Sequence, residues 1–212
     1  VLWSCALSAQ AEMTDMAQVG VGYNHTCAVS SAGKVKCWGD GTYGQLGNGG
    51  YIPQLTAVDV VGLSEPIVAL SLGEQFTCAL TQSGKVKCWG RNNSGQLGNG
   101  TNTDSATPTD VTELTDTVSM IVTGSRFACA LTDAGGVMCW GDNTYGQLGD
   151  GTLLASTVPH SVPSLSAIKA ISAGFNHACA LSLAGAMKCW GRNNYGQLGD
   201  STTTNRSSPV QV

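Results

Sequence analysis

The sequence has few charged and few aromatic residues. Only 11% of its 212 residues are Asp, Glu, Lys or Arg, and only 6% are Phe, Trp or Tyr. With 10 basic residues against 14 acidic ones, the formal net charge is -4. A dedicated nucleic-acid binder usually displays a basic patch or stripe, so we expect no nucleic-acid partner.

Long apolar runs and helical periodicity are also missing. No apolar run approaches the roughly 18 residues that indicate a membrane span, so we expect none. Apolar residues do not recur at helical spacing anywhere, whereas several stretches alternate apolar and polar residues as half-buried strands do. The hydrophobic content of 42% is too high for a disordered chain. We therefore predict an all-β fold whose turns use many of the 28 glycines.

No recognisable catalytic or cofactor-binding constellation occurs. No Ser-His-Asp arrangement or pair of carboxylates recurs at close range, and His160 is isolated. The fragment Gly39–Gly44 fits the dinucleotide pattern Gly-x-Gly-x-x-Gly, but its copies elsewhere lose the middle glycine and no predicted helix follows. We expect no enzymatic activity, no metal and no cofactor.

A fourfold repeat dominates the sequence. The segment KCWGDGTYGQLGNG at 36–49 returns three times with small changes, and the whole unit of 50–51 residues recurs with it. The predicted units are residues 16–66, 67–117, 118–167 and 168–212, which together form one propeller domain, 16–212. Their common tryptophans are Trp38, Trp89, Trp140 and Trp190.

Each unit predicts a four-stranded antiparallel sheet. It begins with an alternating apolar strand that ends in Gly, as at 16–22 and 67–73. A second strand, a short turn and a third strand ending in Cys-Trp-Gly follow, and a weak fourth strand such as 55–61 completes the unit. A sheet this small cannot bury both its faces alone. Radial stacking of such sheets gives a β-propeller.

The repeat resembles that of the regulator of chromosome condensation family. The resemblance rests on Trp-Gly-x-x-x-x-Gly-Gln-Leu-Gly, preceded in the first unit by Gly-x-x-His-Thr-Cys-Ala-Val, and it covers residues 16–212. Members of this family usually have seven blades. The resemblance therefore implies an incomplete ring or open arc that further repeats or a second chain would close.

Each unit also contains two cysteines ten residues apart. If Ser31, Ala32 and Gly33 form a three-residue hairpin loop with Gly33 in the left-handed conformation, Cys27 faces Cys37 at a non-hydrogen-bonded position. The Cα atoms are then about 4.5 Å apart, which suits a disulfide. The same count predicts the bridges Cys27–Cys37, Cys78–Cys88, Cys129–Cys139 and Cys179–Cys189.

Other uses of the cysteines fit the spacing less well. Zinc requires about four converging ligands, and a redox dithiol usually has two intervening residues at a helix start. Buried, reduced cysteines acting as small apolar side chains are the main alternative. Nine cysteines in regular pairs favour an oxidising compartment, so we expect a secreted or cell-surface protein.

Residues 1–15 read as a leader remnant or as the edge of a preceding unit. Ala9-Gln10-Ala11 has the small-x-small pattern of an export-signal cleavage site. An alternative is a lipid anchor on Cys5, although Trp3 fits a lipoprotein pattern poorly. A further alternative is an ordinary strand. Cys5 has no partner in the predicted disulfide set.

Three repeated positions are candidates for structure or binding. The first is the tryptophan, which is expected to act as a wedge between blades and to contribute about 4–6 kcal/mol at most through buried area.

The other two positions would lie on one rim of the propeller. The residue after Trp-Gly alternates between Asp and Arg, which would set opposite charges side by side, and Tyr recurs three residues later. Tyr and Arg on a rigid rim are typical of binding surfaces; the alternative is that they cap turns and hydrate the surface. The candidate rim comprises Asp40, Tyr43, Arg91, Asp142, Tyr145, Arg192 and Tyr195.

These features favour a non-enzymatic binding module. The resemblance includes secreted bacterial members of the family, one of which inhibits a β-lactamase, and thus implies a scaffold that recognises another protein. The alternative that the resemblance implies is guanine-nucleotide exchange on a small GTPase, with attachment to chromatin.

Overall fold

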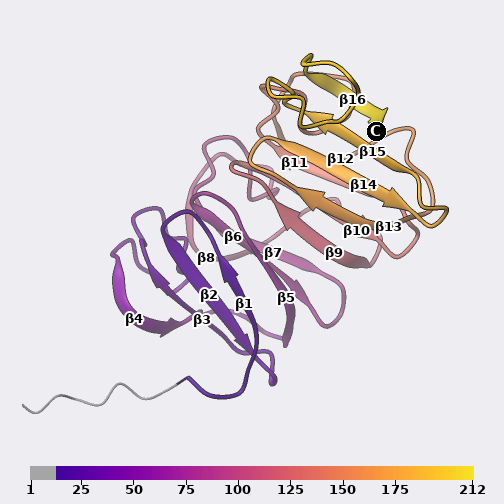
Figure 1. Ribbon diagram of the computed structural model, residues 1–212. Helices are drawn as coiled ribbons and strands as arrows, with labels where there is room; N and C mark the ends of the chain where they lie inside the picture. The colour runs from indigo at the N-terminus through magenta and orange to yellow at the C-terminus, as the bar shows by residue number, and fades with distance from the viewer. Residues whose placement is uncertain (1–12) are drawn as a thin grey trace, which may run out of the picture.

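The fold is entirely β. The computed structural model describes residues 13–212, in which four separate antiparallel sheets of four strands occur and no helix (Figure 1). Every sheet is a meander in which consecutive strands are hydrogen-bonded neighbours. The predicted all-β architecture of four-stranded blades is confirmed, and we number the blades 1 to 4 along the chain.

The strand bounds follow the repeat. Blade 1 contains β1 (Met16–Val21), β2 (His25–Ser30), β3 (Val35–Gly39) and β4 (Gln54–Asp59). Blade 2 contains β5 (Ile67–Leu72), β6 (Phe76–Thr81), β7 (Val86–Gly90) and β8 (Ser105–Asp110). Blade 3 contains β9 (Val118–Thr123), β10 (Phe127–Thr132), β11 (Val137–Gly141) and β12 (Ser156–Ser161). Blade 4 contains β13 (Ile168–Ala173), β14 (His177–Ser182), β15 (Met187–Gly191) and β16 (Arg206–Gln211).

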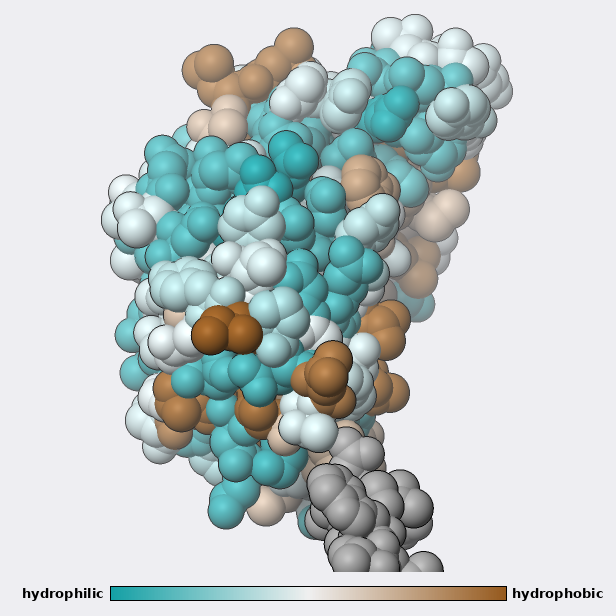
Figure 2. Space-filling view, turned by 90° about the vertical axis from the view of Figure 1, so that its left-hand side faces the viewer, coloured by the Kyte–Doolittle hydropathy of each residue, from teal (hydrophilic) through white to brown (hydrophobic). Residues whose placement is uncertain are grey.

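The four blades form an incomplete propeller. The first strands β1, β5, β9 and β13 contact one another in sequence and line the inner side of the arc. Blades 1 and 4 lie at opposite ends of the row (Figure 1). Seen from the side on which β4 lies, the surface is largely hydrophilic with small, separate apolar patches (Figure 2). Burial is therefore concentrated between blades rather than on their outer edges.

The second and third strands pair as the sequence predicts. Val29 faces Val35, and Cys27 faces Cys37. Gly33 has a φ of 76°, which glycine adopts without steric cost, and its N–H donates to the Ser30 carbonyl at 2.8 Å. The same register holds in all four hairpins.

All four predicted disulfides are present in this register. The paired Cα atoms are 4.0–4.1 Å apart. The bridges are Cys27–Cys37, Cys78–Cys88, Cys129–Cys139 and Cys179–Cys189. The predicted leader or anchor, with Cys5, lies outside the described residues.

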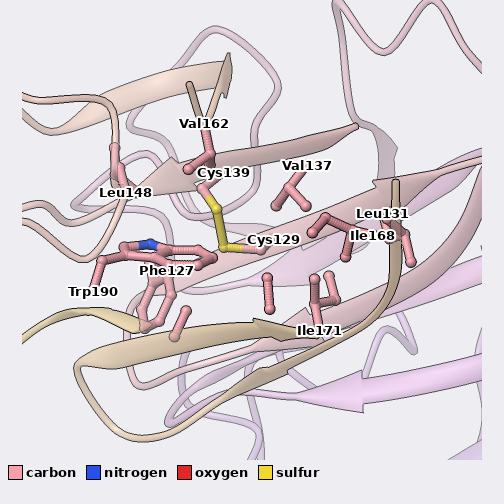
Figure 3. Packing of buried hydrophobic residues seen from close by; sticks show 12 residues of the cluster. Phe127, Cys129, Leu131, Val137, Cys139, Leu148, Val162, Ile168, Ile171 and Trp190 are labelled. Atoms are coloured by element: carbon pink, nitrogen blue, oxygen red, sulfur yellow. A yellow bond between two sulfur atoms is a disulfide. The ribbon is translucent and has the colours of Figure 1, made fainter. Parts of the chain in front are cut away.

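Three hydrophobic clusters hold neighbouring blades together, and each one includes a tryptophan from the following blade. Figure 3 shows the Trp190 indole of blade 4 beside the Cys129–Cys139 disulfide of blade 3. In the same way Trp89 joins the cluster around Cys27 and Cys37, and Trp140 joins the cluster around Cys78 and Cys88. These three indoles are fully buried, whereas Trp38 of blade 1 is only partly buried.

The Gly-Gln-Leu-Gly segment of each of the first three blades contacts the tryptophan indole of the next blade. The Gln45 carbonyl accepts the Trp89 Nε1–H at 3.0 Å, and the carbonyls of the equivalent glutamines accept Trp140 and Trp190 at 3.0 and 2.9 Å. A Cβ on Gly47 would lie 2.7 Å from Trp89 Nε1, so the last position of the segment excludes any side chain. Leu46 is fully buried beneath it.

The disulfides of blades 2 and 4 differ in packing but not in loop length. Replacing either pair with alanines is expected to lower the free energy of unfolding by about 2–3 kcal/mol through chain entropy. C78A/C88A is expected to cost about 1 kcal/mol more than C179A/C189A, because it leaves a cavity beneath Trp140 whereas Cys179 is only partly buried. Urea denaturation followed by circular dichroism measures both; equal losses would contradict the packing role of the disulfide.

Candidate protein-binding face

Two sets of turns meet at one end of the blades. The first set links the first and second strands of each blade, at 22–24, 73–75, 124–126 and 174–176. The second set follows each Cys-Trp-Gly strand. Backbone hydrogen bonds join the sets: Asp40 N–H donates to the Asn24 carbonyl at 2.8 Å, and the other three blades repeat this bond at 2.9 Å. We call this end, comprising both sets of turns, the turn face.

A groove crosses the inner part of the turn face. It has a volume of about 320 Å³ and runs over the ends of the first strands of all four blades. Apolar side chains such as Val21 and Leu72 line it. Tyr23 and Phe175 project from its lining with 69% and 60% of their surface exposed. Large aromatic side chains left in solvent on a rigid frame are typical anchors for a protein partner.

Polar contacts fix the turns around the groove. Arg126 Nε lies 3.5 Å from Glu74 Oε2, which joins blades 2 and 3. Ser125 Oγ donates to Asn176 Oδ1 at 2.8 Å, which joins blades 3 and 4.

The groove could not be predicted from the sequence. One feature of the repeat does point to it: the position after the first-strand glycine is aromatic in some repeats and polar in others.

The predicted rim residues lie on the outer part of the same face. Arg91 stacks over the ring of Tyr43 at 4.7 Å, and Arg192 over the ring of Tyr145 at 5.0 Å. Each stack therefore joins an arginine to a tyrosine of the preceding blade. Tyr195 is 88% exposed. The partner-binding role of these rim residues stays a prediction.

The predicted pairing of opposite charges on this rim is wrong. Among the described residues no ion pair joins Asp40 to Arg91 or Asp142 to Arg192. Asp40 instead accepts the backbone N–H of Thr42 at 3.0 Å, and Asp142 likewise accepts that of Thr144. The aspartates thus accept hydrogen bonds within their own turns. The arginines stack on the tyrosine rings instead, and Arg91 also donates to Gln75 Oε1.

A buried asparagine, also missed from sequence, shapes three of the outer turns. Asn92 is fully buried; its Nδ2 donates to the carbonyls of Thr101 and Thr103, and its Oδ1 accepts the Leu97 N–H at 2.9 Å. Asn143 and Asn193 repeat these bonds. Blade 1 has Gly41 at this position. The apparent dinucleotide motif of Gly39–Gly44 is thus a turn that lacks the asparagine.

Neither a metal cluster nor a membrane helix was found in the part of the chain that the structure describes. No group of three or more His, Cys, Asp or Glu side chains there could hold an ion. Within residues 13–212 no helix has the length and apolar character that crossing a bilayer requires.

Comparison with known proteins agrees with the propeller. The RCC1-like domain family matches residues 5–212. The chain belongs to this family. Human HERC2, an E3 ubiquitin-protein ligase, is 38% identical over 155 residues, which cover 71% of this chain and 3% of HERC2. The ultraviolet-B receptor UVR8 of Arabidopsis thaliana is 36% identical over 153 residues, which cover 71% of this chain and 35% of the receptor.

Solved structures of RCC1-like propellers superimpose closely. Human WBSCR16 gives a TM-score of 0.87 at 24% identity, over 95% of this chain and 54% of WBSCR16. Prp20p of Saccharomyces cerevisiae gives 0.82 at 26% identity, over 93% of this chain and 50% of Prp20p. The chain thus spans about half the length of these two propellers, which agrees with an incomplete ring.

One histidine of this RCC1-like chain is a buried junction residue. His25 is 3% exposed, and its Nε2 lies 2.9 Å from Thr77 Oγ1 of blade 2. Thr77 Oγ1 donates in turn to the Gln45 carbonyl at 3.1 Å, so Nε2 is the donor to Thr77. Burial lowers the pKa of His25 to about 4, against a smaller opposite effect of the Asp40 carboxylate.

The neutral state of His25 predicts an acid-dependent loss of stability. Below pH 6.5, the ordinary His pKa, the unfolded chain binds a proton that the folded chain does not take up until about pH 4. The free energy of unfolding is therefore expected to fall by up to about 3 kcal/mol over this range on account of His25.

His25→Phe, which introduces the residue that blades 2 and 3 carry at this position, is expected to remove that part of the pH dependence. Urea denaturation at pH 7, 5.5 and 4 measures it. An unchanged profile in His25→Phe would contradict the assignment.

Proposed function

We propose that this chain is a non-enzymatic, exported scaffold that binds another protein through its turn face. The groove with Tyr23 and Phe175 is the observation that supports this most directly. These two side chains stay in solvent although most large apolar residues of the blades pack at junctions. The rim arginines lie on the same face, so an apolar centre and a polar surround are combined there, as in many protein interfaces.

Rigidity supports a binding role as well. The turns that border the groove are tied to neighbouring turns by backbone bonds and by the Glu74–Arg126 and Ser125–Asn176 contacts. A surface held in one conformation loses little conformational entropy when a partner binds.

Export is supported by the four disulfides, because such bridges persist in oxidising compartments and are rare in reducing ones. Protein purified from its native source without reductant is expected to gain two hydrogens per bridge on reduction, about 8 Da for four bridges of this geometry. Intact mass spectrometry under denaturing conditions measures the shift. No shift would overturn the assignment to an oxidising compartment.

The binding face can be tested by site-specific photocrosslinking in the native host. A benzophenone amino acid at Tyr23 or at Phe175 is expected to crosslink to the same partner protein. The matched control is Leu183, which is apolar, 69% exposed and situated in the hairpin turn at the opposite end of blade 4. Equal crosslinking from Leu183, or none from Tyr23 and Phe175, would contradict the proposal.

The second candidate is guanine-nucleotide exchange on a small GTPase, or attachment to chromatin. It is favoured by the similarity to Prp20p, whose structure was reported together with its binding to Gsp1p and histones. The net charge of -4 disfavours contact with DNA. Release of a fluorescent GDP analogue from a panel of small GTPases distinguishes the candidates: the scaffold proposal predicts no acceleration.

A further inference from the structure

The four blades differ at their outer edges. The outer strands are β4, β8, β12 and β16, and in the part of the chain that the structure describes no strand pairs with their outer sides (Figure 1). The fourth residue of β8, β12 and β16 is a proline (Pro108, Pro159 and Pro209), whereas β4 has Ala57 there. An open edge can pair with a further strand, and proline hinders this because it has no N–H to donate. Of these four edges, the edge of blade 1 is the one without this protection.

The N–H of Ala57 points to the outside of the blade. Val60 N–H donates to the Val35 carbonyl of β3 at 3.0 Å, and the regular pairing with β3 continues to Val58. Because inward and outward N–H groups alternate along an antiparallel strand, Asp59 and Ala57 direct theirs away from β3. The prolines of the other blades agree with this, since proline is tolerated in a sheet where the missing N–H would face outward.

The end of β4 is accessible whether or not another blade precedes blade 1. The start of an outer strand is contacted by a turn of the preceding blade, as where Gly49 N–H donates to the Ala106 carbonyl of β8 at 2.9 Å. The end of the strand is left open. Asp110 of blade 2 has 68% of its side chain exposed although blade 1 precedes it, and the equivalent Asp59 has 71%. The argument therefore rests on the edge from Ala57 to Val60.

A pocket of about 450 Å³ begins where this edge ends. It lies between the hairpin loop of blade 1 and the link to blade 2, at the end of the blades opposite the turn face. Asp59 belongs both to the edge and to the lining of the pocket. Val60 and Leu63 contribute partly exposed apolar side chains to the lining. We call the edge from Ala57 to Val60, together with this pocket, the edge site.

Blade 2 has an equivalent pocket but a different edge. Its pocket of about 390 Å³ is lined by Asp110, Val111 and Leu114, which correspond to the three lining residues named for blade 1. Pro108 precedes Asp110 in the strand and removes the outward N–H that Ala57 provides. The two blades thus present the same kind of pocket with and without this hydrogen-bond donor.

We infer that the edge site binds a short extended segment of another protein as an added strand. The outward N–H and C=O groups of Ala57 and Asp59 would bond to the backbone of the segment, and an apolar side chain of the segment would occupy the pocket at Val60 and Leu63. In strand addition of this kind the backbone bonds supply affinity and the pocket supplies selectivity. Since the edge site lies away from the groove, the inference is independent of the binding function proposed above.

A second copy of the chain fits the edge site less well than a flexible segment does. Its other outer strands carry proline, so β4 would have to pair with β4. The free edge is only about 13 Å long, and contact between two such edges would bury far less than the roughly 1,200 Å² of a small stable interface. A flexible segment can follow the edge and also fill the pocket.

Ala57→Pro tests the inference with the full chain, because proline at this position is already compatible with the fold in three blades. Random heptapeptides displayed on phage are selected on the wild-type chain and depleted on Ala57→Pro, and the remaining peptides are synthesised. Fluorescence polarisation is expected to show binding at least about tenfold weaker for Ala57→Pro, which loses a donor and places its ring in the path of the strand. Ala57→Gly keeps the N–H and is expected to bind as the wild type does.

Two further measurements locate the bound peptide. Pro108→Ala gives blade 2 the same outward N–H and is expected to add a second binding site, measured by isothermal titration calorimetry. In ¹⁵N-labelled wild type, the amide protons of Ala57 and Asp59 are expected to exchange more slowly when the peptide is bound. Circular dichroism verifies that each variant is folded.

Three results would overturn the inference. The first is a selection that yields no peptide able to distinguish the wild type from Ala57→Pro. The second is unchanged exchange of the Ala57 and Asp59 amides, or no second site in Pro108→Ala. The third is dimerisation of the wild-type chain, seen by sedimentation velocity and abolished by Ala57→Pro, because a second copy would then occupy the edge.

Discussion

The hydrogen bond from a tryptophan indole to a glutamine carbonyl of the preceding blade is the contact on which this structure depends. A four-stranded sheet of this size exposes both its faces unless a neighbour covers them. The indole fills the junction and lies against the disulfide of the preceding blade (Figure 3). Its polar N–H is hydrogen-bonded although the surrounding side chains are apolar. A buried donor without a partner would cost about 1–3 kcal/mol, so the carbonyl must be held in place. The Gly-Gln-Leu-Gly segment holds it at all three junctions, and a buried asparagine supports that segment at the second and third.

The division between constant and variable positions follows from this contact. Cys, Trp, Gln, Leu and the last Gly serve every junction and therefore recur in all four blades. The residues after the first-strand glycine lie outside the apolar clusters of the junctions, on the turn face, where Tyr23, Glu74 and Phe175 differ from one another. A repeated frame thus presents a surface that is not repeated, which is what recognition of one particular partner requires.

Much of the fold could be predicted because it depends on pairing between strands that are close together in the sequence. The hairpin glycines at Gly33 and its counterparts fix the register, and the register places the cysteines opposite each other. The Tyr–Arg stacks, the groove and the role of His25 could not be predicted, since they depend on how neighbouring blades pack, which periodicity within a unit does not contain. The predicted pairing of opposite charges after Trp-Gly was wrong for the same reason. The role of Asn92 could not be predicted from the repeat, because blade 1 has Gly41 in its place.

Hydrogen exchange of the indole N–H protons tests most directly whether the tryptophan–carbonyl bonds are closed in the folded protein. In ¹⁵N-labelled protein, with signals assigned by single Trp→Phe substitutions, the indole protons of Trp89, Trp140 and Trp190 are expected to exchange only through opening of a blade junction. Trp38, which is only partly buried and whose indole makes no such bond among the described residues, is expected to exchange much faster, by about a hundredfold or more if junction opening costs a few kcal/mol. Equal exchange of all four would contradict the account.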